Sequence, residues 1–207
     1  MTSLANTSTA YVWFDTEYTT LDINRAALLQ VAMIVTDADL KRLTPPDADV
    51  NLFVRIPPTV EVSPWIKENM PDLVARCRSA DALPIEDVDK RLSDVLDRHV
   101  VVPAGDDKRK PVLAGNSIHA DWYLAQKYLP GFMSRLHYRH LDVTALKLQW
   151  QDWFKGEEFD KSSAALIAEN FPDAALQAAG GRRHDAYYDV CASIAELQFY
   201  RKRLMKV

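Results

Sequence analysis

The segment YVWFDTEYTTLD, residues 11–22, places two carboxylates at the end of an apolar run. The run is rich in aromatic and β-branched residues, which predicts a buried β-strand over 10–18. Side chains two residues apart on a strand point to the same face, so Asp15 and Glu17 are expected side by side, about 7 Å apart along the backbone. Two acids so close repel each other unless a cation lies between them. A divalent metal ion held by oxygen ligands is one explanation, and an acid that merely caps the following loop is the other.

Outward from this strand, the pattern changes from strands to alternating strands and helices. Strands are expected at 10–18, 27–40, 50–57, 111–117 and 137–143. Helices are expected at 63–70, 84–100, 120–129, 144–154 and about 184–205. Three strands joined by short loops indicate an antiparallel meander, and the later strand–helix pairs add parallel strands. The sequence therefore predicts an α/β fold: a mixed sheet, with a three-strand antiparallel meander plus parallel strands, flanked by helices.

Length and composition fit one globular domain. We expect a single domain over 10–207 after a disordered N-terminal tail, 1–9, in a chain that is 48% hydrophobic and 26% charged. Two cysteines, Cys77 and Cys191, do not suggest a disulfide framework, which favours a reduced, cytoplasmic compartment. No apolar stretch approaches the roughly 18 residues of a membrane span, so no membrane partner is expected.

The net charge of −4 argues against binding of long nucleic acid by phosphate neutralisation. An enzyme that acts on a short nucleic-acid substrate remains compatible with this charge.

Further acids and a histidine stand in places suited to catalysis. Asp121 follows a short strand at the start of a helix, where α/β proteins keep their sites, although an acid there also complements the helix dipole. His184 and Asp189 are five residues apart, roughly 140° on an ideal helix. We therefore expect Asp189 on the last helix and His184 in the loop before it, loosened by Gly180 and Gly181. A histidine ordinarily titrates at about pH 6.5, which suits a general base; a local hydrogen bond at the helix start is the alternative.

Taken together, these residues resemble a known family. Asp15-x-Glu17, Asp121 and His184-x-x-x-x-Asp189 match the DEDDh branch of the DEDD 3′→5′ exonucleases, which have an RNase H-like fold. The blocks VTDADL (35–40), LAGNSIHAD (113–121), LHYRHLDVTALK (136–147) and SIAELQFYR (193–201) resemble the oligoribonuclease family in particular. The resemblance runs from the first strand to the last helix and so covers nearly the whole domain.

The resemblance implies a 3′→5′ exoribonuclease that hydrolyses short oligoribonucleotides, down to dinucleotides, to nucleoside 5′-monophosphates. It implies two divalent metal ions, Mg²⁺ or Mn²⁺, held by Asp15, Glu17, Asp121 and Asp189. By the same likeness, Asp15 bridges both ions and His184 is the general base that takes a proton from the attacking water.

The resemblance also assigns substrate contacts. Leu21 resembles an apolar wedge against a base, and Trp65 an aromatic that stacks on one, with a core role as its alternative. The residues that resemble a cap over the 5′-phosphate are Ser117, Tyr138, Arg139 and Thr144. In the family the 138–144 segment reaches into the neighbouring subunit's site, which implies a homodimer.

The chain departs from the family pattern in two places, and both concern substrate grip. WIKENMPDLVARC (65–77) replaces the usual residues after the tryptophan, and Ala145 stands where a second hydroxyl residue is usual. The departures leave open a broader DEDDh exonuclease acting on longer RNA or single-stranded DNA. A catalytically silent nucleic-acid-binding module is the third alternative, and the complete set of acids argues against it.

Overall fold

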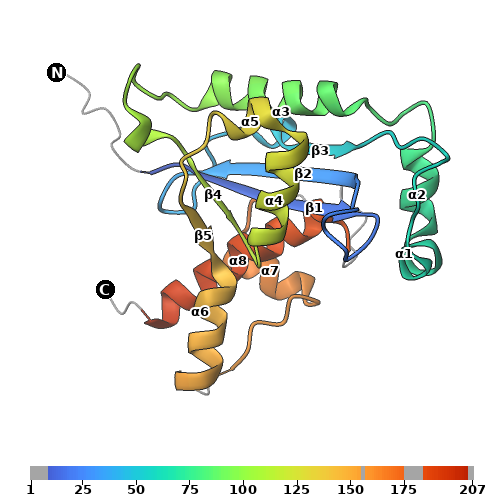
Figure 1. The fold of residues 1–207 in the computed structure, drawn as a ribbon. Helices are drawn as coiled ribbons and strands as arrows, with labels where there is room; N and C mark the ends of the chain where they lie inside the picture. Colours follow the sequence, from blue (N-terminus) through green and yellow to red (C-terminus); the bar gives the residue numbers. More distant parts are fainter. Residues whose placement is uncertain (1–8, 155–156, 175–183, 205–207) are drawn as a thin grey trace.

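The computed structural model of the chain describes residues 9–154, 157–174 and 184–204 (Figure 1). Five strands form one sheet in the order β3-β2-β1-β4-β5. They are β1 (Tyr11–Tyr18), β2 (Leu28–Thr36), β3 (Val50–Phe53), β4 (Val112–Gly115) and β5 (His140–Asp142). Antiparallel pairs join β1 to β2 and β2 to β3, whereas β4 runs parallel to both β1 and β5. The predicted mixed sheet, a meander extended by parallel strands, is confirmed.

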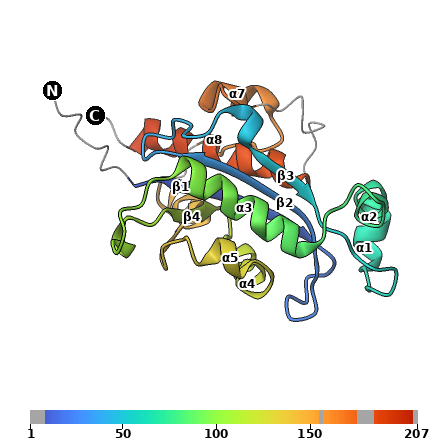
Figure 2. The same cartoon turned by 90° about the horizontal axis from the view of Figure 1, so that it is seen from above.

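Helices cover both faces of this sheet (Figure 2). On one face lie α7 (Ala164–Asn170) and α8 (Ala186–Leu204). On the other face lie α3 (Ile85–His99), α4 (His119–Tyr128) and α5 (Pro130–Met133). Successive side chains of β1 point to opposite faces of the sheet and so contribute to both cores. Trp13 packs with α8, whereas Phe14 packs with α3 and α5. Phe14 and Phe132 stack with their ring centroids 5.1 Å apart.

A third, smaller core holds two short helices beside the sheet. The helices are α1 (Pro64–Asn69) and α2 (Pro71–Cys77), and Ile66, Val74 and Cys77 bury apolar surface beneath them. Each begins with a proline at its first position, where the missing N–H costs no hydrogen bond. The Oγ of Ser63 caps α1 by accepting a bond of 3.3 Å from the Ile66 N–H. This cap fixes the start of α1 and thereby the position of Trp65, the second residue of the helix.

The structure differs from the predicted elements in length and number. Three short helices, α2, α5 and α7, were not predicted, and β5 is shorter than the expected 137–143. The helix expected at 144–154 is divided into α6 (Val143–Gln149) and a π-helical turn, Trp150–Phe154. In this turn Trp150 is buried, stacks on Phe154 and packs against Phe199.

Some expectations fall on parts of the chain outside the described residues. These are the tail at 1–8, the loop glycines Gly180 and Gly181, and the last residues expected for the final helix. Among the helices that the structure describes, none combines the length and apolar character needed to cross a lipid bilayer.

Candidate active site

Three carboxylates meet where β1 ends and α8 begins. Oxygen atoms of Asp15, Glu17 and Asp189, hereafter the acidic cluster, lie within 4.8 Å of one another. Asp15 and Glu17 are on the face of β1 that α8 covers, and Asp189 is in the first turn of α8. The local fold brings together acids that stand more than 170 positions apart in the sequence.

The acidic cluster lines a cleft of about 940 Å³. Its other walls come from the loop after β1, the start of α1, the loop after β4, and two residues near α7 and α8. The remaining lining residues are Thr16, Tyr18, Thr20, Leu21, Ser63, Pro64, Trp65, Ile66, Asn116, Ser117, Lys161 and His184. The lining of the cleft therefore combines carboxylates with apolar and aromatic side chains.

Asp121, the fourth predicted acid, adjoins the acidic cluster from the opposite face of the sheet. It lies in the first turn of α4, is 6% exposed, and does not belong to the three-acid group. Its Oδ1 accepts hydrogen bonds from the Thr16 N–H at 2.9 Å and the Thr16 hydroxyl at 2.7 Å. Thr16, which the sequence analysis did not single out, thus anchors Asp121 beside Asp15 and Glu17.

Burial and mutual repulsion disfavour the charged forms of these acids. Burial, reinforced by Asp121, Asp189 and Glu17, raises the pKa of Asp15 well above its ordinary value. Burial, reinforced by Asp189 and Asp121, raises the pKa of Glu17 to about 8. Burial also raises the pKa of Asp121 to about 7, although the bonds from Thr16 oppose the change. Such an arrangement favours a bound cation, which would relieve the repulsion.

The donor set fits a hard divalent cation. Carboxylate oxygens are the ligands that Mg²⁺ and Mn²⁺ prefer in proteins. Among the described residues that line the cleft, Lys161 carries the one permanent positive charge, which cannot balance the whole group of acids. The sequence-based expectation of an acidic metal site thus has a matching arrangement of side chains.

His184 lies just before α8, as predicted, and is exposed. Its backbone adopts φ +66°, in the left-handed region that is unusual for a non-glycine residue. Its N–H donates to Asp189 Oδ2 at 3.2 Å, and its ring packs edge-on against Trp65, with the centroids 5.4 Å apart. His184 therefore contacts both Asp189 of the acidic cluster and Trp65.

Asp185, the residue after His184, caps the start of α8. Its Oδ1 accepts from the N–H groups of Tyr187 and Tyr188, at 3.1 Å and 3.2 Å. Its Oδ2 accepts from the side-chain amide of Gln30 at 3.0 Å. These hydrogen bonds place Asp185 at the start of the helix and not among the three clustered acids.

The predicted substrate contacts divide into two groups. Leu21, Trp65 and Ser117 line the cleft, with Leu21 90% and Trp65 50% exposed. Thr144, in the first turn of α6, lies beside Ser117, whose N–H donates to the Thr144 Oγ1 at 2.8 Å.

Tyr138 and Arg139 do not line this chain's cleft. Tyr138 is 75% exposed, and Arg139 stacks on it with its guanidinium carbon 5.5 Å from the ring centroid.

Two other residues of the site were missed from the sequence. Lys161 lines the cleft, and its Nζ lies 3.3 Å from Glu196 Oε2. Glu196 is fully buried on α8. Its position within the apolar block SIAELQFYR was a usable signal, because a buried acid needs a partner, but nothing in the sequence identifies Lys161 as that partner.

Comparison with known proteins agrees with this geometry. A protein-family model described as "Exonuclease" matches residues 12–197. The mitochondrial oligoribonuclease of Bos taurus is 31% identical over 199 residues, which cover 94% of this chain and 73% of the relative. An oligoribonuclease of Francisella tularensis subsp. tularensis is 27% identical over 197 residues, with 95% and 96% covered.

The chain belongs to the exonuclease family, in its oligoribonuclease group. It is a hydrolase of the 3′→5′ exoribonuclease class, as predicted.

Solved structures share the exonuclease fold. Exonuclease I from Methylocaldum szegediense superposes with a TM-score of 0.63 at 24% identity, covering 96% of this chain. Exonuclease I of E. coli, in complex with a 5cy-dT13 oligonucleotide, gives 0.61 at 17% identity, covering 95%. This chain spans 41% of each of those longer chains. At these identities the likeness concerns the fold.

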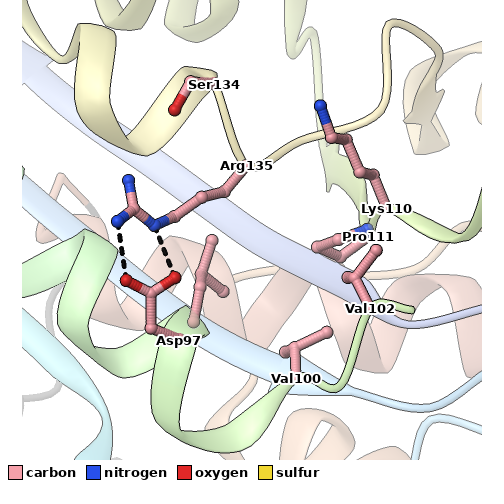
Figure 3. Close-up of a pocket in the computed structure, with 8 residues that line it drawn as sticks. Asp97, Val100, Val102, Lys110, Pro111, Ser134 and Arg135 are labelled. Carbon is pink, nitrogen blue, oxygen red and sulfur yellow. Dashed lines mark hydrogen bonds and ion pairs between the residues drawn. The ribbon is translucent and has the colours of Figure 1, made fainter. Parts of the chain in front are cut away.

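A second hollow of this exonuclease lies away from the acidic cluster, between the ends of α3 and α5 (Figure 3). Its volume is about 300 Å³. Arg135 there is engaged by Asp97 through two bonds of 2.7 Å and 2.6 Å, and Lys110 pairs with Asp107 at 2.9 Å. Among the described residues that line this hollow, Asp97 is the one acid and it is held by Arg135, so the hollow lacks the group of carboxylates that the cleft contains.

Proposed function

We propose that this exonuclease removes nucleotides from the 3′ end of short single-stranded RNA, down to dinucleotides, and releases nucleoside 5′-monophosphates. The acidic cluster on the wall of the cleft carries this proposal. A cleft that combines carboxylates, which can hold metal ions for the phosphodiester, with an aromatic side chain for a base matches a substrate of a few nucleotides.

We assign four acids to two divalent ions, Mg²⁺ or Mn²⁺. Asp15, Glu17 and Asp189 supply the clustered oxygens, and Asp121 adds its carboxylate from the other side of β1. When bound, such ions lower the pKa of an attacking water and stabilise charge on the leaving 3′-oxygen. We take Asp15 as the ligand shared by both ions, as the resemblance to the DEDDh exonucleases implies.

His184 serves as the general base in this proposal. It is exposed to the cleft, and its N–H bond to Asp189 keeps it next to the acidic cluster. An imidazole in this place can take a proton from the attacking water. The contact with Trp65 restrains the ring without using either ring nitrogen as a hydrogen-bond partner.

Leu21 and Trp65 would hold the bases. Both side chains line the cleft and are exposed, although burying them would be favourable in the free protein. Stacking on an aromatic ring accepts every base, because each base has a π-face. Stacking of this kind would let the enzyme bind RNA of any sequence with few charged contacts.

The 5′ end would be held by residues of two subunits. Ser117 and Thr144 belong to the chain's own site, whereas Tyr138 and Arg139 are exposed and available to a neighbour. In the proposed homodimer, the 138–144 segment completes the neighbouring subunit's site. Exposed apolar side chains that follow this segment, Trp153 at 80%, Phe154 at 55% and Leu148 at 52%, supply a surface whose burial would stabilise the pair.

A length series tests the substrate preference. Hydrolysis of 5′-labelled RNA from two to twenty nucleotides is followed in Mg²⁺ and in Mn²⁺, with DNA of the same lengths as the control. We expect RNA of two to four nucleotides to be degraded fastest. Equal rates on a 20-mer or on single-stranded DNA would favour the broader exonuclease, and binding without hydrolysis would favour a silent binding module.

A further inference from the structure

Lys161 is a cation built into the wall of the cleft that the proposed reaction does not use. It follows the π-helical turn and precedes α7, in a tight turn closed by Asp160. Asp160 Oδ1 accepts from the Ser162 N–H at 2.8 Å and from the Ser162 hydroxyl at 2.6 Å. The Lys161 carbonyl accepts a 2.7 Å bond from the hydroxyl of Tyr188, which is 2% exposed. The backbone at Lys161 is thus pinned to α8.

Glu196 fixes the other end of the lysine. Its side chain is completely buried, and Lys161 Nζ lies 3.3 Å from its Oε2, with 23% of the lysine side chain exposed. The same carboxylate accepts from Asn116 Nδ2 at 3.1 Å and from the Tyr200 hydroxyl at 2.8 Å. A buried carboxylate needs such partners to offset its loss of water. Glu196 therefore holds the ammonium group at one place.

The fixed ammonium group faces the reaction. Lys161 lines the cleft together with the acidic cluster and His184. It acts on Asp15 with a sign opposite to that of the acids, lowering the pKa that they raise. An ammonium group has three N–H donors, so the pairing with Glu196 does not exhaust what it can donate.

We propose that Lys161, positioned by Glu196, donates to a non-bridging oxygen of the substrate's 3′-terminal phosphodiester. The inference rests on the proposed function, because it takes RNA as the ligand of the cleft. In this proposal the phosphodiester of the substrate meets a positive charge that the protein itself supplies. The rival account is that Lys161 only neutralises Glu196 and the acids of the free protein.

Salt dependence of binding separates the two accounts. The probe is a 5′-fluorescein RNA trinucleotide, and its anisotropy is measured in Ca²⁺ from 50 to 200 mM KCl, with a gel to confirm that it stays intact. Each phosphate contact to a single strand contributes about −0.7 to the slope of log K against log salt. Lys161→Gln should flatten the slope by about 0.7 and weaken binding about tenfold.

Two variants control for charge and for location. Lys161→Arg should retain the wild-type slope, because it keeps a cation at this site. Lys90→Gln removes an exposed lysine of α3 that pairs with Asp94, and should change nothing. If Lys161→Gln fails to fold because Glu196 loses its partner, the double variant Lys161→Gln/Glu196→Gln keeps the pair neutral and should show the same flattening.

A second probe identifies the phosphate. In it, the 3′-terminal linkage is a methylphosphonate, which carries no charge. This probe keeps one neutral phosphoryl oxygen but no charge, so the difference between wild type and Lys161→Gln should shrink well below tenfold, whereas an unchanged tenfold difference would overturn the proposal. An unchanged slope with the natural probe would overturn it as well. If the wild-type protein binds neither probe, the proposed function itself fails; if it binds and Lys161→Gln matches it, this inference fails alone.

Discussion

Glu17→Gln should stabilise the metal-free protein while it removes a proposed metal ligand. Burial and the neighbouring acids raise the pKa of Glu17 from 4.5 to about 8. The difference of about 3.5 pH units, at about 1.36 kcal/mol for each unit, sets an upper limit of about 5 kcal/mol on the stability that the folded protein loses through the charge of Glu17. Neighbouring acids that take up protons relieve part of this loss, so we expect Glu17→Gln to raise the free energy of unfolding by roughly 2–3 kcal/mol. For a chain of this size, that corresponds to a rise in Tm of roughly 5–10 °C.

The sign of the effect depends on pH. Below the ordinary pKa of 4.5, both the folded and the unfolded states hold the proton and no penalty exists. Between that value and about 8, the unfolded state releases a proton that the folded state keeps, so stability falls as the pH rises. The gain from Glu17→Gln should therefore be close to complete at pH 8, and below about 1 kcal/mol at pH 5.

Thermal unfolding in EDTA at pH 5 and pH 8, followed by circular dichroism, measures this difference. Glu169→Gln, which changes an exposed acid on α7, is the matched control and should leave Tm unchanged at both values. A Glu17→Gln protein that is no more stable than wild type at pH 8 would refute the reasoning. An equal gain at both pH values would refute it too.

Four further substitutions test other parts of the account. His184→Ala should lower kcat by about 10²–10⁴-fold in steady-state kinetics, yet preserve the rise in Tm that we expect Mg²⁺ to cause, since the acidic cluster is intact. Trp65→Ala should weaken binding of short RNA by about 1–3 kcal/mol, measured as Kd, because one stacked base loses its platform; an unchanged Kd would remove Trp65 from the site. Trp153→Lys should convert the proposed dimer to monomers in native mass spectrometry, since the exposed apolar surface would carry a charge. Leu92→Ala, at a fully buried position of α3, should lower the free energy of unfolding by about 2–5 kcal/mol in urea titrations, with no change in kcat on the remaining folded enzyme.

The sheet was predictable because its signals are local. The apolar run before Asp15 fixes β1, and alternation at 50–57 indicates a strand whose regular part is Val50–Phe53. Short helices escape such reasoning, because the seven residues of α2 and the four of α5 give too few turns for a period to be recognised. Pro71 and Pro130 at their first positions were the available start signals.

The site was predictable to the extent that residue spacing defines it. Asp189 lies on α8 and His184 precedes that helix, as the five-residue spacing indicated. The anchoring of Asp121 by Thr16 and the Lys161–Glu196 pair join segments that are distant in sequence. The first comes from packing of α4 against β1 and the second from packing of the turn before α7 against α8, so both require the three-dimensional structure.

The central claim is that the four acids make this cleft a metal-dependent 3′→5′ exonuclease site for short RNA. The most direct test follows a 5′-labelled RNA tetranucleotide in Mn²⁺, with wild type and Asp121→Ala compared at equal concentration. We predict that wild type yields labelled trimer, dimer and mononucleotide in that order, that EDTA stops the reaction, and that Asp121→Ala loses it. Unchanged hydrolysis by Asp121→Ala, or release of the labelled 5′ nucleotide as the first product, would contradict the account.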